Sequence, residues 1–214
     1  MKTRKTKTCL IVVAHPDDET LWAGGTLLSH PQWDCFIVSL CRKKDPDRAP
    51  KFQKVLEALG ANGVMGDMND DPEQRPIEEE EFERMVLKLL PEQAFDLVIT
   101  HSPEGEYTRH LRHEETGTAV IKLWQNGDLR TKELWLFAYE DNDKAYLPRA
   151  VESATAFFKL SKAVWQQKYD LITQIYGFEE DSWEAKTTPV AEAFWQFKNS
   201  FDAGKWLNKQ SRKS

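Results

Sequence analysis

The chain has no long hydrophobic run. No stretch of its 214 residues approaches 18 consecutive apolar residues, which is the length that a membrane-spanning helix needs. The N-terminal stretch MKTRKTKTCL is basic, but the apolar run after it is short and ends at charged residues. This pattern is typical of the start of a strand and not of a secretory signal, so we expect no membrane span.

The chain also has few cysteines and no excess of positive charge. Cys9, Cys35 and Cys41 are the only three cysteines, and two of them lie in strand-like runs. Buried thiols in a reducing compartment fit this pattern better than a disulfide framework, so we predict a cytoplasmic protein. A net charge of −6 provides no basic field that would attract phosphates. We therefore expect a small-molecule partner and no nucleic acid, and the sequence leaves a homo-oligomer open.

Apolar bulk is plentiful, with 40% hydrophobic residues that include 8 tryptophans and 11 phenylalanines. A chain of this length and composition can bury one substantial core, so we predict a single domain over residues 1–214. Short apolar runs alternate with helical patterns and predict strands at 8–14, 35–40, 63–66, 95–100 and 133–139. Helices are predicted at 19–29, 48–60, 78–90, 156–177 and 190–201. Near-continuous apolar strands of this kind indicate an α/β fold with a mostly parallel sheet, helices on both faces, and C-terminal helices packed on the body.

Polar groups that could bind a metal ion follow the first apolar run, in the stretch HPDDE at 15–19. His15 and Asp18 are three residues apart, so in a turn of helical geometry they project to a common side, while Asp17 points elsewhere. Two ligands and one free carboxylate are what a hydrolytic metal site needs. Taken alone, the acids could equally well complement the positive end of a helix.

Histidines gather in the same way after another predicted strand. In HSPEGEYTRHLRHEETG, at 101–117, His110 and His113 are again three residues apart, and we expect Glu114 and Glu115 to open the next helix. Four of the five histidines follow predicted strand ends: His15, His101, His110 and His113. Because ligands bind at the carboxyl edge of such sheets, convergence of the two pairs on one ion is the better explanation.

With these motifs on hand, the sequence resembles the LmbE/PIG-L family of zinc-dependent de-N-acetylases. The resemblance rests on AHPDDE at 14–19, on the Gly-Gly-Thr at 24–26 and on the His-x-x-His at 110–113. It covers roughly the first 125 residues. The chain is accordingly divided into a metal-site core at 1–125 and a closing strand with C-terminal helices at 126–214.

The resemblance implies a Rossmann-like fold and a role for each residue of the site. His15, Asp18 and His113 would hold Zn²⁺, although other divalent metals could fit the same ligands. Asp17 would act as general base toward the water on the zinc, and His110 would stabilise the developing oxyanion. Two further residues would contact substrate, namely Arg48, 12 positions before Gly60, and Tyr107, whose spacing differs by one residue.

The chain departs from the family pattern between its two later histidines. The family commonly reads His-Pro-Asp-His, whereas here Leu111 and Arg112 stand between His110 and His113, and Arg109 precedes the pair. The missing acid removes a partner for the charged form of His110, and nearby cations should lower its pKa. Either arginine could meet a phosphate or carboxylate on the substrate, but solvated surface charge is the preferred interpretation.

Amide hydrolysis is the function that these features predict, with an N-acetylated amino sugar or its conjugate as substrate. Two alternatives stay open. A receiver-like signalling domain also carries paired acids after its first strand to hold Mg²⁺, although Lys144 follows the fifth strand too late and the histidines would be idle. A non-catalytic protein of the same fold could bind the metal and a sugar without turnover.

Overall fold

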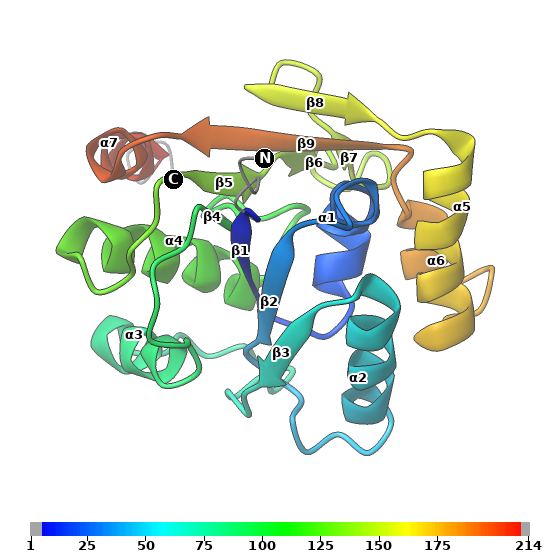
Figure 1. Cartoon of the computed structure of the whole chain (residues 1–214), viewed down its shortest axis with the longest axis horizontal. Coiled ribbons are helices and arrows are strands. Elements are labelled where there is room, and N and C mark those ends of the chain that lie inside the picture. The colour runs from blue at the N-terminus through cyan, green and yellow to red at the C-terminus, as the bar shows by residue number, and fades with distance from the viewer. Residues whose placement is uncertain (1–5, 211–214) are drawn as a thin grey trace, which may run out of the picture.

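The computed structural model describes residues 6–210 and contains a seven-stranded sheet in the order β3-β2-β1-β4-β5-β9-β8. The strands of this sheet are β1 (Thr8–Val13), β2 (Asp34–Ser39), β3 (Asn62–Met65), β4 (Leu97–Thr100), β5 (Leu134–Phe137), β8 (Ala156–Lys159) and β9 (Ala191–Phe197). A separate two-stranded sheet pairs β6 (Tyr139–Glu140) with β7 (Arg149–Ala150). Figure 1 shows the main sheet running through the molecule, with helices on both of its faces.

The helices are α1 (Asp18–Ser29), α2 (Arg48–Leu59), α3 (Glu79–Leu87), α4 (Leu111–Asn126), α5 (Lys162–Asp170), α6 (Trp183–Thr187) and α7 (Ser200–Gln210). A π-helical turn, η1 (Leu171–Ile175), continues α5. The side chains of β1 alternate between two cores. Ile11 and Val13 pack into one core with residues of α1, α2 and η1, while Leu10 and Val12 pack into the other with residues of α3, α4 and α7. The predicted α/β class, with a mostly parallel sheet covered on both faces, is confirmed.

The first five strands are parallel and fix where a ligand would bind. Their order, 3-2-1-4-5, is that of a Rossmann-like sheet, and it reverses direction between β1 and β4. Ligands of open α/β sheets bind in the crevice at such a switch point, beyond the carboxyl ends of the strands. Receiver domains have the order 2-1-3-4-5, so the strand order argues against the signalling alternative.

Two of the helix predictions in the C-terminal part are wrong. Residues 156–159 form β8, so the helical region begins only at α5, and most of 190–201 forms β9. β9 runs antiparallel to both β5 and β8. Its aromatic residues recur at positions that also fit a helical stripe, and such a short run does not tell a strand from a helix by periodicity. Pairing with two neighbours decides the outcome, because it satisfies the backbone of β9 on both edges.

The helix after the later histidines also begins earlier than expected. α4 starts at Leu111, so His113 lies within its first turn and Glu114 and Glu115 do not open it. Within residues 6–210, no helix is both long enough and apolar enough to cross a bilayer.

A buried ion pair joins β9 to α1 and α5. Glu192 on β9 lies 2.7 Å from Lys168 Nζ, and neither side chain is exposed. The same carboxylate accepts hydrogen bonds from the backbone N–H groups of Gly25 and Thr26, each at 2.7 Å. These contacts satisfy the carboxylate completely, which a buried charge requires.

Replacement of Glu192 by alanine should therefore destabilise the fold strongly. Glu192→Ala leaves the Lys168 ammonium buried without its partner, which typically costs about 3–5 kcal/mol. The urea midpoint of unfolding measures the loss. Glu180→Ala, at an exposed glutamate, is the control and should change stability by no more than about 0.5 kcal/mol. Equal midpoints for the two variants would contradict the structural role of the pair.

Candidate metal centre and active site

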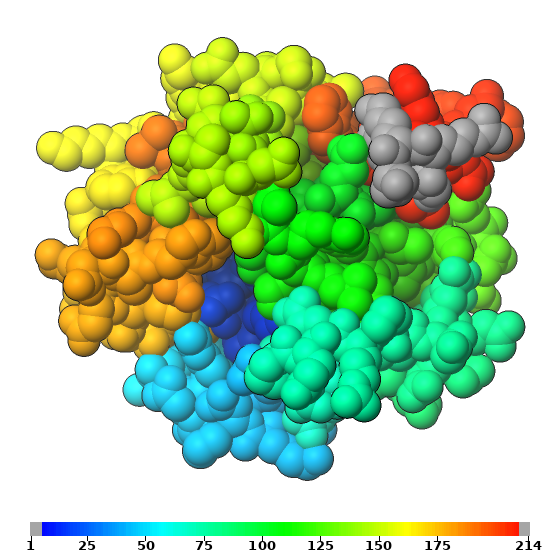
Figure 2. Space-filling view, turned by 180° about the vertical axis from the view of Figure 1, so that it is seen from behind, coloured from blue at the N-terminus to red at the C-terminus, as the bar shows by residue number. Residues whose placement is uncertain are grey.

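The candidate site lies where the chain leaves β1 and β4. Figure 2 shows a hollow on this side of the molecule, with the N-terminal segment in dark blue at its floor. The backbone N–H of Ala14, directly after β1, donates to Nε2 of His101, directly after β4, at 3.0 Å. This bond ties the two loops together at the switch point of the sheet.

The three predicted metal ligands converge. Nδ1 of His15 lies 3.2 Å from Oδ2 of Asp18 and 3.2 Å from Nε2 of His113. The third distance, from His113 Nε2 to Asp18 Oδ2, is 3.3 Å. Ligand atoms about 2.1 Å from a tetrahedral ion lie about 3.4 Å apart, so the three atoms fit one divalent cation. A bound cation would also relieve the crowding of three electron-rich atoms.

Each of the two histidines in this triangle has a carboxylate at its other ring nitrogen. Oε2 of Glu106 lies 2.7 Å from Nδ1 of His113, and Oδ1 of Asp70 lies 3.1 Å from Nε2 of His15. A carboxylate that accepts the N–H of a metal-binding histidine holds its ring and fixes which nitrogen carries the proton, as Glu106 does for His113. Asp70 lies within ion-pair distance of His15, but the two atoms are not aligned as a hydrogen bond. Neither acid was predicted from the sequence, because acids in an irregular loop carry no spacing signal that would tell a site residue from its acidic neighbours.

Glu106 is the more deeply placed of these two acids. It is 1% exposed, and its Oε2 also lies 2.8 Å from Nδ1 of His101, while Oε1 accepts from the backbone N–H of Ser102. Burial alone would raise the pKa of Glu106, but the imidazoles of His101 and His113 outweigh it and hold the pKa at about 2. The carboxylate therefore stays ionised between the two rings.

His101 lies beside the triangle without being suited to join it. Its Nε2 is 3.4 Å from Asp18 Oδ2, and its ring lies 4.0 Å from that of His113. However, Nε2 already accepts the N–H of Ala14, and Nδ1 faces Glu106. Both nitrogens are thus engaged, so the ring serves to join loops and not to bind an ion.

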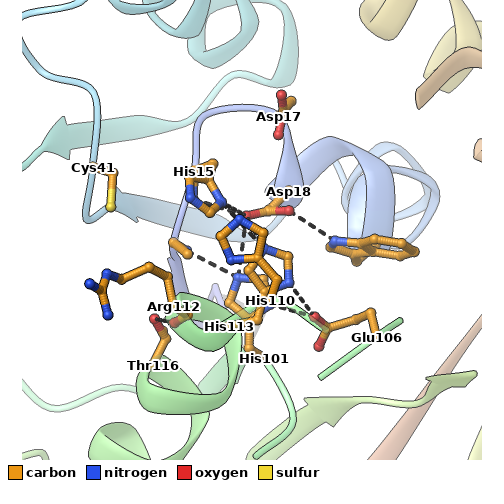
Figure 3. A network of polar contacts seen from close by, with 12 residues as sticks. His15, Asp17, Asp18, Cys41, His101, Glu106, His110, Arg112, His113 and Thr116 are labelled. Carbon is orange, nitrogen blue, oxygen red and sulfur yellow. Dashed lines mark hydrogen bonds and ion pairs between the residues drawn. The ribbon is translucent and has the colours of Figure 1, made fainter. Parts of the chain in front are cut away.

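Asp17 occupies a different position from Asp18, as the spacing predicted. Figure 3 shows it apart from the four clustered imidazoles. Its backbone has φ 126°, a strained conformation for a residue with a side chain, and strain of this kind concentrates at functional sites. Burial and the neighbouring Asp18 carboxylate raise the pKa of Asp17 well above its usual value, while Arg48 opposes them. A raised pKa makes a carboxylate a better proton acceptor.

Arg48 reaches into the site from the start of α2. Its Nη1 donates to Oδ2 of Asp17 at 3.0 Å, and its guanidinium lies 4.3 Å from the ring centre of Phe178. The structure thus places Arg48 at the site and not as a helix-start side chain in solvent. Its flat face is held by an aromatic ring, which is a geometry that lysine could not reproduce.

His110 and Tyr107 border the triangle. The His110 ring lies 4.6 Å from both the His15 and the His113 rings. Burial, followed by the imidazoles of His113 and His15, lowers the pKa of His110 to about 3. The lowered pKa of His110 agrees with the expectation from the sequence, but Arg109 and Arg112 are not its cause. Tyr107 lies 5.4 Å from His113 and 4.9 Å from Trp183, ring centre to ring centre.

The two arginines beside the histidines have different environments. Arg109 has a side chain that is 71% exposed and pairs with Glu114, so it fits the interpretation as solvated charge. Arg112 is 1% exposed and pairs with Glu115, so for this residue that interpretation is wrong. With its donors occupied inside the protein, Arg112 does not face a substrate.

Comparison with known proteins now places the chain in a family. Residues 10–124 match the model of the GlcNAc-PI de-N-acetylase family, PIG-L, and this segment contains every side chain of the triangle. The chain belongs to the PIG-L family. The resemblance that the motifs suggested is confirmed.

Individual relatives are distant. An uncharacterized protein of Acanthamoeba polyphaga mimivirus is 22% identical over 185 residues, covering 80% of this chain and 76% of that protein. The N,N'-diacetylchitobiose deacetylase of Pyrococcus horikoshii is 16% identical with a TM-score of 0.67, covering 93% of this chain and 86% of its own. The 4-carboxy-2-hydroxymuconate hydratase GalB of Pseudomonas putida is 17% identical with a TM-score of 0.62, covering 89% and 96%. At these identities the structural matches show a shared fold.

Loss of the Glu106 carboxylate should weaken metal binding. Glu106→Gln keeps the side-chain shape but cannot hold the His113 ring with a charged acceptor, and such changes typically cost about 10–100-fold in metal affinity. Competition with a fluorescent zinc chelator measures the affinity. Glu180→Gln, at an exposed position, should bind as the unaltered protein does. An unchanged affinity of the Glu106 variant would show that this carboxylate does not support the metal centre.

Proposed function

We propose that the protein hydrolyses the N-acetyl group of an amino sugar or amino-sugar conjugate, with a divalent cation, in the first place Zn²⁺, held by His15, Asp18 and His113. The observation that carries this proposal is the triangle of ligand atoms with sides of 3.2, 3.2 and 3.3 Å, built inside the segment that matches the PIG-L family. The family description names a de-N-acetylase, and one of the similar folds is a deacetylase of diacetylchitobiose.

The chain's own residues divide the chemistry between them. When bound, a divalent cation would polarise the acetyl carbonyl and lower the pKa of water. Asp17 accepts the proton of the attacking water, because burial and Asp18 raise its pKa and so make it a stronger base. Arg48 holds the Asp17 carboxylate in place at 3.0 Å. Asp17 then returns the proton to the amine that leaves.

His110 stabilises the negative charge that develops on the carbonyl oxygen. With a pKa of about 3 its ring is neutral near pH 7, and a neutral imidazole still offers one N–H donor. Donors fixed in place before the reaction act without reorganisation, which is the basis of an oxyanion hole. Tyr107 and Arg48, at the rim, would contact the substrate.

Fold similarity does not select this reaction, since the hydratase GalB shares the fold. Support for deacetylation comes instead from the family match together with the ligand geometry. A protein that binds metal and sugar without turnover is the remaining alternative, and release of acetate separates the two.

A screen of N-acetylated sugars should reveal metal-dependent deacetylation. We expect free amine and acetate from at least one N-acetylglucosamine derivative or conjugate when Zn²⁺ is present, and none after treatment with a chelator. Fluorescamine detects the amine and a coupled assay detects the acetate. Activity that persists in chelator, or metal binding without product from any such sugar, would contradict the proposal.

Asp17 offers a sharper test of the mechanism. Asp17→Asn should leave zinc affinity within about threefold, since Asp17 is no part of the triangle, but should lower kcat on the order of 100-fold or more through loss of the base. Asp47→Asn, at an exposed aspartate beside α2, serves as the matched control. Wild-type turnover by the Asp17→Asn variant would reject the role given to this residue.

A further inference from the structure

Arg112 stands between His110 and His113 and is buried, and its contacts show what it does. Its Nε donates to the backbone carbonyl of Asn69 at 2.6 Å, and its Nη2 donates to that of Arg75 at 2.7 Å. Both carbonyls belong to the loop between β3 and α3. Arg112 therefore binds this loop and not the His110 ring.

Glu115, one turn further along α4, completes the attachment. It pairs with Nη1 of Arg112, and its Oε1 accepts the backbone N–H of Ile77 at 3.0 Å. The loop is thus held to the start of α4 at three backbone positions, by a buried arginine and its carboxylate partner. Charge-assisted bonds of this kind are stronger than neutral ones, so they fix the loop firmly.

Gln74 lies within the attached segment and turns toward His110. Its Oε1 accepts the backbone N–H of Leu111 at 2.9 Å, which satisfies a donor at the exposed start of α4. That bond fixes the orientation of the amide, because only its oxygen can accept. The amide nitrogen then lies 3.2 Å from Nδ1 and 2.9 Å from Nε2 of His110. Because the in-plane directions of the two ring nitrogens diverge, contact with both places the amide against the face of the ring and leaves the ring edge free.

The other contacts of the His110 ring are with aromatic rings. It stacks on the His113 ring and meets the His15 ring edge-on, each at 4.6 Å, and it meets the Tyr107 ring edge-on at 6.2 Å. In residues 6–210, Gln74 is the only side chain with a polar contact to it. A ring that must direct one N–H at a reacting oxygen has to be held at fixed side-chain torsion angles. The Gln74 amide, packed against the ring, restricts these torsion angles further.

We propose that Gln74 is a positioning residue for His110 and that Arg112 and Glu115 keep it in place by anchoring the loop between β3 and α3. The inference rests on the proposed function for the step that His110 assists. In this chain the neutral amide of Gln74, carried by a neighbouring loop, orients the ring. Arg112, between the two histidines, holds that loop in place.

Gln74→Met tests the proposal, because methionine has a similar shape and makes no strong hydrogen bonds. In the zinc-loaded protein we expect the ring NMR signals of His110, assigned with His110→Gln, to shift or broaden, while those of His101 stay in place. We further expect kcat to fall about 10–100-fold, as small misplacements of a catalytic group do, with KM and zinc affinity within about twofold. Glu73→Met, at the exposed preceding residue, is the matched control and should match the wild type.

Three results would overturn the inference. One is an unchanged His110 signal in Gln74→Met, which needs no substrate and so decides the matter even where no deacetylation is found. A second is a shifted ring with unchanged kcat, since the position would then not matter to the reaction. The third is an equal loss of zinc affinity, which would mean general damage to the centre. Glu115→Gln, which weakens the anchor but keeps an acceptor for Ile77, should produce the same changes in smaller measure.

Discussion

The buried carboxylate of Glu106 connects the two segments that carry the candidate metal ligands, the loop after β1 and the first turn of α4. A chain of hydrogen bonds runs from the backbone of Ala14 through His101 to Glu106 and on to His113. It connects the end of β1 with the end of β4 and with the first turn of α4. Because each link uses a ring nitrogen that could otherwise bind the ion, the chain leaves Nε2 of His113 as the free ligand atom. The triangle of ligands depends on this arrangement.

The three consecutive acids after β1 have three different tasks. Asp18 contributes to the triangle and is oriented by the indole N–H of Trp22, which donates to its Oδ1 at 3.0 Å. Glu19 is buried and accepts from the Tyr176 hydroxyl and from the backbone N–H of Asp17. Asp17, held in its strained conformation by that bond, faces Arg48. If the three acids served only to interact with the positive end of the α1 dipole, they would not need these separate partners.

Much of this arrangement could be predicted from the sequence, and the exceptions have physical causes. The apolar strands and the two three-residue spacings, His15 to Asp18 and His110 to His113, carry periodic information, so the sheet edge and the convergence of the two pairs follow from them. The family resemblance then singles out His15, Asp18 and His113 as the ligands. Asp70 and Gln74 act across long separations from positions in loops, where no spacing rule applies. Glu106 is close in sequence to its partners, but its loop has no regular period that would show which way the side chain points. The nature of β9 depended on its two neighbouring strands, which local periodicity does not reveal.

The floor and the walls of the hollow come from different parts of the chain, and this division bears on substrate choice. The ligand triangle, Asp17 and His110 lie within the segment 10–124 that the family shares. Two aromatic contacts at the rim come from beyond it, where Phe178 packs on Arg48 and Trp183 packs on Tyr107. The residues that carry out the chemistry, at the floor of the hollow, must be of particular types. The residues around its opening need only match the shape of the ligand. For the proposed reaction, selection among substrates is thus expected to reside in the C-terminal segment around α6, which Figure 2 shows in orange beside the hollow.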